Sequence, residues 1–456
     1  MTRPTSNGET AKLSTEPYKG VRDFYPDDWA KMEAMFDRLR ETLTLAGFEE
    51  YQASPLERAE LYEAKTSEEI VSEQTYTFTD RGDRRVTLRP EMTPTLARMV
   101  AGRRRELAFP LRWFSIGDRF RYERPQRGRL RDFYQCDIDI LGLPEGEADV
   151  EALVLAARLI RDFGATEQDF VIRVSARPLL NAACVAAGLT EDGVRSYLRL
   201  LDKKDKMTTE AFSAARTAIT AQDPLSFIED AGRDPVVAAE KKKLLDRLET
   251  VMGRGVANVV FDPSITRGFD YYTGMVFELY DTNLENPRAL FGGGRYDRLV
   301  SLFGGDPVPA IGFALGDVTL ADFIESHSLP LDTGARRPQI YLGTPRPEDI
   351  PAAQAFAVRL RERGVRVFVN LTARSLGDQI RDAAKRGIPF FAAYGADEIA
   401  NNVLRVKTLW TGGETGLAID ALPNFVRRCG ISSSISRASR KPGSSRAVAS
   451  ILTIRS

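Results

Sequence analysis

The sequence predicts two folded domains of different classes, an α+β domain followed by a small α/β domain. Three observations lead to this expectation. Residues 119–142 alternate in a way that predicts two antiparallel strands around an arginine-rich loop. Residues from 179 to about 250 are mostly helical in pattern and rich in charge, which indicates a helical insertion. Residues 339–409 alternate between strand-like and helix-like stretches, which is typical of a partly parallel sheet with helices.

Length and composition indicate a globular protein with a large core. The chain has 456 residues, of which 43% are hydrophobic, and its net charge is zero. No apolar run approaches the length of a membrane span, and the first residues lack the apolar core of a secretory signal. We therefore expect a cytoplasmic protein that does not contact a membrane. The cysteines are widely spaced and His327 is the single histidine, so we predict no protein-bound metal site.

Polar and turn-rich segments divide the chain into its expected parts. Residues 1–15 are polar and are predicted to be disordered. The first domain is expected to cover residues 16–328, and the turn-rich segment at 328–337 separates it from a second domain at 338–428. Residues 429–456 are rich in serine and contain five basic residues and no acidic one, which predicts a disordered tail.

The elements before the hairpin include one candidate binding residue. Residues 29–47 have the apolar spacing of an amphipathic helix, and residues 48–56 look extended. Farther along, Glu91 follows a strand-like stretch and precedes a helix that Pro94 begins. A carboxylate at this place can hold an ammonium group, but it can equally cap the helix, and the local pattern favours capping.

The hairpin has one polar and one apolar face. In its second strand, the apolar residues Cys136, Ile138 and Ile140 alternate with polar or aromatic ones, so one face belongs to the core and the other is a candidate site. Residues 103–131 contain ten arginines and three acidic residues, a high density for a neutral chain. A solvated, charge-mixed surface is the alternative interpretation. The predicted polar face carries Arg119, Arg121 and Glu123 in the first strand and Arg131, Phe133, Gln135, Asp137 and Asp139 in the second.

Two later stretches also combine chemistry-bearing residues. In residues 262–280, Arg267 precedes Tyr271 and Tyr272, which point to opposite faces if the chain is extended, so that one ring is core while the other lines a site. Residues 291–300, FGGGRYDRLV, place three glycines before Arg295 and permit a ligand to approach the backbone closely. The stretch lacks the GxxxxGK[ST] pattern of a phosphate-binding loop, which occurs nowhere in the chain.

Four stretches in this order resemble a known family. RYERPQRGRLRDFYQ resembles motif 2 of class II aminoacyl-tRNA synthetases, and TRGFDYYTGMVFE resembles the signature of histidyl-tRNA synthetases. TLRPEMTP and FGGGRYDRLV complete the set, and the resemblance covers residues 20–428. It implies a mixed, mainly antiparallel catalytic sheet, an anticodon-binding C-terminal domain, and a homodimer joined through residues 29–56. The implied substrates and cofactors are L-histidine, ATP, Mg²⁺ and tRNA(His).

The resemblance also implies a role for each matching residue. Arg121 and Arg267 would be the catalytic arginines, facing the α-phosphate from two sides. The residues implied for histidine are Glu91, Thr93, Gln135, Asp139, Tyr271 and Tyr272. Those implied for ATP are Arg121, Glu123, Arg129, Phe133 and Arg295. Gln126 and Arg131 match positions near the tRNA acceptor end.

Two departures from the family pattern leave an alternative open. Many members carry Glu-Arg in motif 3, where the arginine bonds the γ-phosphate, but this chain has Val318 and Thr319. Asp139 stands where some members have glutamate. A paralogue that has lost activation and senses histidine or tRNA is therefore the second hypothesis. A threonyl or prolyl enzyme fits TRGFDYYTG poorly.

Overall fold

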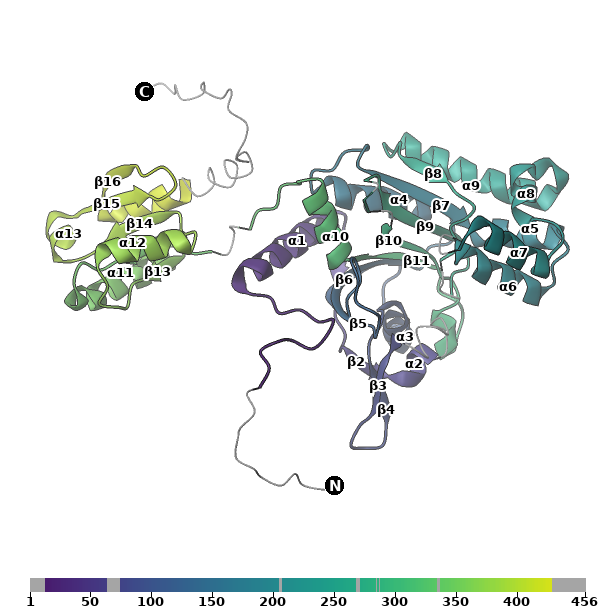
Figure 1. Cartoon of the computed structure of the whole chain (residues 1–456), viewed down its shortest axis with the longest axis horizontal. Helices are drawn as coiled ribbons and strands as arrows, with labels where there is room; N and C mark the ends of the chain where they lie inside the picture. Colours follow the sequence, from purple (N-terminus) through teal and green to yellow (C-terminus); the bar gives the residue numbers. More distant parts are fainter. Residues whose placement is uncertain are drawn as a thin grey trace. The chain divides into compact units, whose positions relative to one another are not determined.

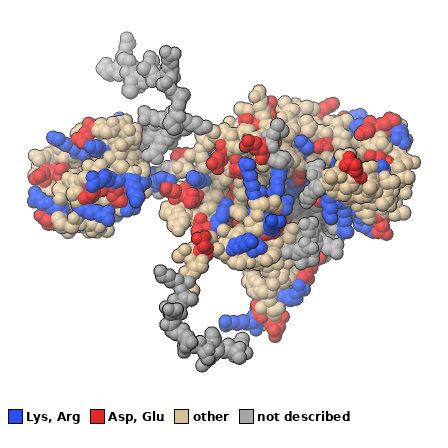
Figure 2. Space-filling model, viewed as in Figure 1, with Lys and Arg blue, Asp and Glu red and all other residues tan. Residues whose placement is uncertain are grey.

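The computed structural model describes the chain in two compact units, which divide between Leu331 and Asp332. Among the described helices, none is long and apolar enough to cross a membrane. Acidic and basic side chains are interspersed over the face seen in Figure 2, in keeping with the neutral net charge. Two segments were predicted to be disordered, residues 1–15 and 429–456, and of these only residues 13–15 belong to the described part of the chain. The described residues are 13–63, 74–204, 207–267, 271–283, 285–286, 288–333 and 337–428.

An eight-stranded sheet forms the centre of the first unit (Figure 1). Its strands lie in the order β1-β5-β6-β11-β10-β9-β7-β8. Neighbouring strands from β5 to β7 are antiparallel, whereas the outermost pairs, β1 with β5 and β7 with β8, are parallel. The prediction of a mixed, mainly antiparallel sheet is confirmed. The strands are β1 (Glu49–Glu50), β5 (Leu111–Phe120), β6 (Asp132–Leu141), β7 (Phe170–Ala176), β8 (Val259–Phe261), β9 (Met275–Asp281), β10 (Ala289–Arg295) and β11 (Ala310–Gly316).

Helices cover the apolar face of this sheet. Strand β6 shows the reason, because the side chains of Cys136, Ile138 and Ile140 alternate with polar ones and enter one core with Met35 and Leu153 from two of the helices. The opposite face of β6 carries the polar side chains and stays available for a site. The covering helices are α1 (Pro26–Leu45), α4 (Glu147–Arg161) and α10 (Asp317–Ser326).

A helical segment follows β7, at the edge of the sheet formed by β7 and β8 (Figure 1). Four of its helices begin at a residue whose side chain accepts a hydrogen bond from the first turn, namely Thr190, Thr208, Asp223 and Asp234. These short side chains satisfy backbone N–H groups that have no partner within the helix. The helices are α5 (Arg177–Ala186), α6 (Glu191–Leu201), α7 (Thr209–Ile219), α8 (Pro224–Glu229) and α9 (Pro235–Gly253).

A small antiparallel sheet precedes the hairpin in the first unit, with the strand order β2-β4-β3. The end of β4 leads through Arg89 and Glu91 into helix α3. The sheet thus brings Glu91 to the start of α3. These elements are β2 (Leu56–Arg58), α2 (Ala59–Glu63), β3 (Tyr76–Thr79), β4 (Arg85–Leu88) and α3 (Thr93–Arg103).

The second unit has its own five-stranded sheet, in the order β13-β12-β14-β15-β16. The first three strands are parallel, and β15 and β16 are antiparallel to their neighbours. The six strands and helices predicted between residues 339 and 409 are all present, while α13 and β16 are additional. The elements are β12 (Ile340–Gly343), α11 (Ile350–Glu362), β13 (Val367–Val369), α12 (Leu376–Lys385), β14 (Phe390–Ala393), α13 (Ala396–Asn401), β15 (Val403–Thr408) and β16 (Glu414–Ala418).

Candidate functional site

A cavity of about 990 Å³ opens on the polar face of the large sheet. Its walls come from β6, β9, β10 and β11, from the loop between β5 and β6, and from the starts of α3 and α10. Its size matches cavities that hold cofactors or small ligands. All the site residues predicted from the sequence line this cavity except Arg131 and Arg295.

Strand β6 supplies the floor of the cavity. Phe133, Gln135, Asp137 and Asp139 all line it, as the alternation predicts. Arg119 does not face the cavity, because its guanidinium is fully buried and its Nη2 lies 2.6 Å from the Asp137 carboxylate. The Gln135 amide donates to the other Asp137 oxygen over 3.2 Å. Arg119 therefore neutralises a carboxylate that a buried site would otherwise carry unpaired.

Glu91 faces the cavity instead of capping α3. The residue before α3 is Met92, and no side chain caps this helix. The Glu91 carboxylate accepts a hydrogen bond from the Tyr271 hydroxyl at 2.8 Å, and the Tyr62 hydroxyl donates to the Glu91 carbonyl oxygen at 3.2 Å. The capping interpretation, which the local pattern favoured, is wrong. Glu91 is a buried carboxylate held at the wall of the cavity.

A second carboxylate and phenol pair lies in the cavity. The Tyr296 hydroxyl donates to Asp139 Oδ1 at 2.5 Å, and both side chains are buried. Two glycines make room for this arrangement. A Cβ atom on Gly312 would lie 1.9 Å from Asp139 Oδ1, and one on Gly294 would lie 2.8 Å from the ring of Tyr272. The small residues of β10 and β11 therefore let side chains of the neighbouring strands and loop lie across the sheet surface.

The pKa of Asp139 is raised to about 8, chiefly because burial disfavours the charged form, while the hydrogen bond from Tyr296 lowers it. Asp137 also raises it and Arg119 lowers it. An aspartate in an unfolded chain has a pKa of about 4. Between these two values the folded state holds a proton that the unfolded state has lost, so Asp139 contributes stability below pH 4 that disappears as the pH rises to about 8.

We therefore expect the wild-type free energy of unfolding to fall more steeply between pH 5 and pH 8 than that of Asp139→Asn, because asparagine keeps the acceptor for Tyr296 and does not ionise. Chemical denaturation at several pH values measures the difference between the two slopes. Asp137→Asn is the comparison variant, because it removes a neighbouring buried carboxylate and keeps Asp139, so its slope should stay closer to that of the wild type. Parallel curves for the wild type and Asp139→Asn would contradict the prediction.

Another part of the cavity combines an aromatic ring with arginines. The Arg121 guanidinium lies 5.5 Å from the centroid of the Phe133 ring, and its Nε donates to the Pro90 carbonyl oxygen at 2.9 Å. Arg129 Nη1 lies 3.0 Å from the Glu123 carboxylate. Strand β5 ends at Phe120, so Arg121 and Glu123 lie in the connecting loop and not in the strand as predicted. This loop still brings both residues to the cavity.

Arg267 lies between β8 and β9 with an unusual backbone. Its φ angle is +53°, which is uncommon for a residue with a side chain. Arg177 donates to its carbonyl oxygen at 2.8 Å, and the Arg267 guanidinium lies 3.2 Å from Glu278 on β9. A strained backbone held by specific partners is a frequent feature of functional sites. The following residues 268–270 lie outside the described part of the chain.

Tyr271 and Tyr272 do not divide between core and site. The chain at this point is not an extended strand, and both rings line the cavity with their centroids 5.0 Å apart. The prediction of opposite faces assumed the period-two alternation of a strand and is wrong for that reason.

Arg131 and Arg295 are both buried away from the cavity. Arg131 donates to the Glu123 carbonyl oxygen at 3.1 Å and to the Tyr18 hydroxyl at 3.2 Å, and its guanidinium lies 3.9 Å from the centroid of the Tyr122 ring. It therefore braces the base of the hairpin loop and does not present a free cation to the tRNA acceptor end. The placement of Arg131 on the polar face assumed that the alternation of the strand includes this residue, but β6 begins only at Asp132. Its role near the tRNA acceptor end was implied by the family resemblance alone.

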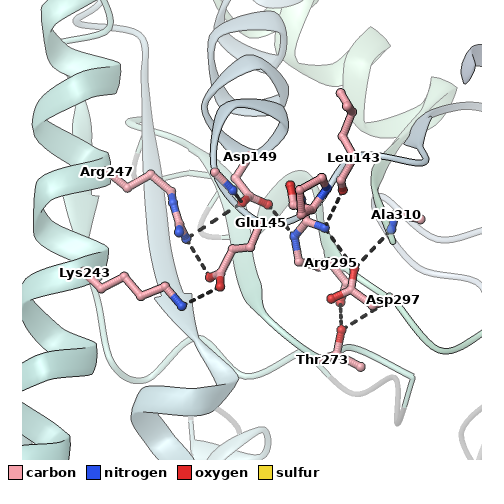
Figure 3. Close-up of polar contacts among 11 residues, drawn as sticks. Leu143, Glu145, Asp149, Lys243, Arg247, Thr273, Arg295, Asp297 and Ala310 are labelled. Carbon is pink, nitrogen blue, oxygen red and sulfur yellow. Dashed lines mark hydrogen bonds and ion pairs between the residues drawn. The ribbon is translucent and has the colours of Figure 1, made fainter. Parts of the chain in front are cut away.

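Arg295 belongs to a buried ion network, shown in Figure 3. Its guanidinium lies 2.8 Å from Asp149 on α4 and 2.9 Å from Asp297, and it donates to the carbonyl oxygens of Leu143 and Pro144. Its side chain is 1% exposed. These contacts use the donors that ATP would need, so the structure does not support the predicted ATP contact. The Arg295 carbonyl oxygen accepts from the backbone of Thr273 at 2.7 Å, which fixes the end of the loop that carries Tyr271.

Several residues of the cavity were not identified from the sequence. Gly292 and Gly294 belong to the glycine run that the sequence indicated, and they face Arg267 and Tyr272, whereas Tyr296, which continues their alternation just past β10, was not identified. This alternation through the glycine run was the signal that could have identified Tyr296. Glu278 and Arg288 also line the cavity, and only the pairing of β9 with β10 brings their segments to it.

Two family models match the chain. Histidyl-tRNA synthetase matches residues 20–319, and the anticodon binding domain matches residues 340–428. A histidine–tRNA ligase of Leptospira biflexa is 37% identical over 414 residues, which cover 87% of this chain and 94% of that protein. A histidine–tRNA ligase of Halobacterium salinarum is 37% identical over 421 residues, covering 89% and 96%.

Solved structures have the same fold. A histidyl-tRNA synthetase from Nostoc superimposes with a TM-score of 0.74 at 24% identity, covering 91% of this chain and 100% of that one. An ATP phosphoribosyltransferase regulatory subunit/histidyl-tRNA synthetase from Bacillus halodurans gives a TM-score of 0.65 at 22% identity, covering 84% and 98%. With a family model over most of the first unit and curated relatives over nearly the whole chain, this protein belongs to the histidyl-tRNA synthetase family.

Proposed function

We infer that this protein is a histidine–tRNA ligase, which activates L-histidine with ATP to histidyl-adenylate and transfers the histidyl group to the 3′ end of tRNA(His). The observation that carries this inference is one cavity with two kinds of polar wall. Buried carboxylate and phenol pairs, Glu91 with Tyr271 and Asp139 with Tyr296, suit a small amino acid with an ammonium group. Arg121 and Arg267 suit the phosphates of a nucleotide.

The proposed histidine contacts follow from these pairs. The Glu91 carboxylate and the Thr93 hydroxyl would hold the ammonium group, and Gln135 would lie near the carboxyl end. Asp139 with Tyr272, and Tyr296 as an additional partner, would bond the two imidazole nitrogens. A site that offers paired hydrogen-bonding groups to imidazole rejects apolar side chains of similar size, because its own groups would be left unpaired.

The proposed chemistry is electrostatic. Activation joins the histidine carboxylate to the α-phosphate of ATP and releases pyrophosphate, and negative charge develops on the phosphoryl oxygens. Arg121 and Arg267 would stabilise this charge, and Phe133 would stack on the adenine ring. Glu123 and Arg129, which form an ion pair at the wall, would position the nucleotide. No protein base is required at this step.

Mg²⁺ fits the cavity as an ion carried by ATP. Among the described residues, no group of three or more acidic, histidine or cysteine side chains could form a metal site. Glu123 and Glu278 each pair with an arginine, so we expect at most one of these carboxylates to coordinate the ion. Phosphate oxygens of ATP and water molecules would supply its other ligands. When bound, the ion would neutralise charge on the leaving pyrophosphate.

We propose that the protein contacts tRNA through the cavity wall and the second unit. Gln126 lies at the cavity wall, where the acceptor end of tRNA would arrive, and the second unit would bind the anticodon.

A homodimer through residues 29–56 is supported by the exposed Leu45 and Leu56 and by β1, a sheet-edge strand. Sedimentation equilibrium would reject the dimer by returning the monomer mass. We place the protein in the cytoplasm, where tRNA and ATP occur.

The sensing paralogue has less support. A protein that only binds histidine has no use for arginines on a second wall of the cavity, and this chain retains both Arg121 and Arg267 there. The match of residues 340–428 to an anticodon binding domain also favours a protein that acts on tRNA.

Histidine-dependent exchange of pyrophosphate into ATP tests the proposed function. We expect exchange with histidine and only background exchange with threonine or proline, because these lack an imidazole to pair with Asp139. Charging of a tRNA(His) transcript tests the second step. Binding of histidine without any exchange would reject the ligase and leave the sensor.

A further inference from the structure

The arginines of the cavity are not equally available to a ligand. Among the described residues, four arginines line it, Arg121, Arg129, Arg267 and Arg288. Arg129 and Arg267 each lie against a carboxylate, at 3.0 and 3.2 Å. The hydrogen bonds of Arg121 and Arg288 go to neutral oxygens, and the guanidinium of Arg121 also lies over the uncharged Phe133 ring. Their charges are therefore the least compensated on the cavity wall.

Arg288 reaches the cavity from the residues just before β10. Its side chain is exposed, with Nη1 donating to the Arg127 carbonyl oxygen and Nη2 to the Gln126 amide oxygen, each at 3.1 Å. Both acceptors belong to the loop that connects β5 and β6. Arg288 thus bridges the rim of β10 and this loop, and it leaves part of its guanidinium for a ligand.

The wall beside Arg288 is the start of α10, where Thr319 stands. The Thr319 hydroxyl donates to the Leu290 carbonyl oxygen at 2.7 Å, which ties α10 to the first residues of β10. From the other side, a Cβ on Gly128 would lie 3.8 Å from the Thr319 methyl group, so the loop passes over this position. Thr319 brings no charge to the cavity. Arg288 lies two residues before Leu290, the residue that accepts the Thr319 hydrogen bond.

We propose that Arg288 binds the terminal phosphates of ATP at this side of the cavity and supplies the cation that Thr319 does not. The proposal rests on the ligase function proposed above. A planar guanidinium at an open rim can form two charge-assisted hydrogen bonds to a phosphate, whereas the buried Arg295 cannot. Binding of the phosphates would also hold the loop over the nucleotide, because the same guanidinium contacts Gln126 and Arg127.

Arg288→Ala in the full-length protein tests this role. We expect the KM for ATP in histidine-dependent exchange to rise about tenfold or more, the value of one or two charge-assisted bonds. The KM for histidine and the affinity for AMP, which lacks the terminal phosphates, should change less than about twofold, since differences of that size lie within ordinary surface effects. Arg288→Lys should fall between the wild type and alanine, because lysine keeps the charge and loses the fork.

Arg298→Ala is the matched control, because Arg298 is also exposed and follows β10 but does not line the cavity. A rescue variant separates phosphate binding from bracing of the loop. Thr319→Arg added to Arg288→Ala should restore a low KM for ATP if the missing group is a cation at this wall. An unchanged KM for ATP in Arg288→Ala, or equal rises in the KM for ATP and for histidine without rescue, would overturn the proposal. A wild type without exchange would instead reject the ligase.

Discussion

Replacing Arg267 with alanine is expected to lower kcat for histidine-dependent pyrophosphate exchange by about 100-fold to 1,000-fold, the usual effect of removing one donor to a charge that develops in the transition state. The KM values for ATP and histidine should change much less, because Arg267 would interact most strongly with the phosphoryl group as it transfers. Arg267 holds its position through Glu278 and through the Arg177 contact to its carbonyl oxygen.

The fold should survive this substitution. Glu278 is 22% exposed and retains a hydrogen bond from the Tyr280 hydroxyl at 2.6 Å, so the loss of Arg267 does not leave a buried carboxylate without a partner. Thermal unfolding and histidine binding verify that the variant is folded. Arg267→Lys serves as the conservative variant and should recover part of kcat. A folded Arg267→Ala protein with kcat within tenfold of the wild type would remove Arg267 from the mechanism, since about tenfold is only 1.4 kcal/mol.

The second large effect is on stability. Replacing Arg295 with alanine is expected to destabilise the first unit by about 3–5 kcal/mol, because the buried Asp149 carboxylate then keeps only the Gly146 N–H at 2.6 Å and Arg247 at 3.9 Å. The Asp149 side chain has no exposed surface, and burial raises its pKa while Arg295 lowers it. Arg247, at 3.9 Å from Asp149, is too distant to replace the lost contacts (Figure 3).

Denaturant unfolding in a Trp410→Phe background measures this effect, because the remaining tryptophans, Trp29 and Trp113, both lie in the first unit. Arg298→Ala, an exposed arginine three residues along the chain, should change the free energy of unfolding by less than about 0.5 kcal/mol. Replacing both partners, as Arg295→Met with Asp149→Leu, should recover much of the loss. Equal stability of Arg295→Ala and Arg298→Ala would show that the network contributes little.

Much of the candidate site could be predicted because alternation along a strand is a local property. In β6, Phe133, Gln135 and Asp139 reach the cavity while Cys136 and Ile138 enter the core, as the sequence pattern predicts. The strands and helices of the second unit were recognisable for the same reason. The resemblance to histidyl-tRNA synthetases then supplied roles that no periodicity contains.

The errors occurred where long-range contacts outweigh local pattern. Glu91 has the local context of a helix cap, yet the Tyr271 hydroxyl, 180 residues away, holds its carboxylate at the cavity. Arg131 and Arg295 have the appearance of ligand-binding arginines, but other parts of the chain surround them with acceptors. A guanidinium can bind a ligand only if acceptors from other parts of the fold do not already occupy its donors. The spacing of residues in the sequence does not specify those acceptors.

By itself, the sequence determined the two-domain order, the polar and apolar faces of the hairpin, and the family. These depend on the period of side chains along each strand or helix and on motifs that are short and contiguous. Only the tertiary structure decided which charges remain available in the cavity. It buried Arg295 against Asp149 and Arg119 against Asp137, and it left Arg288 beside the uncharged Thr319. The physical reason is that desolvation and pairing of a charge depend on neighbours brought together by the sheet order, which adjacent residues do not specify.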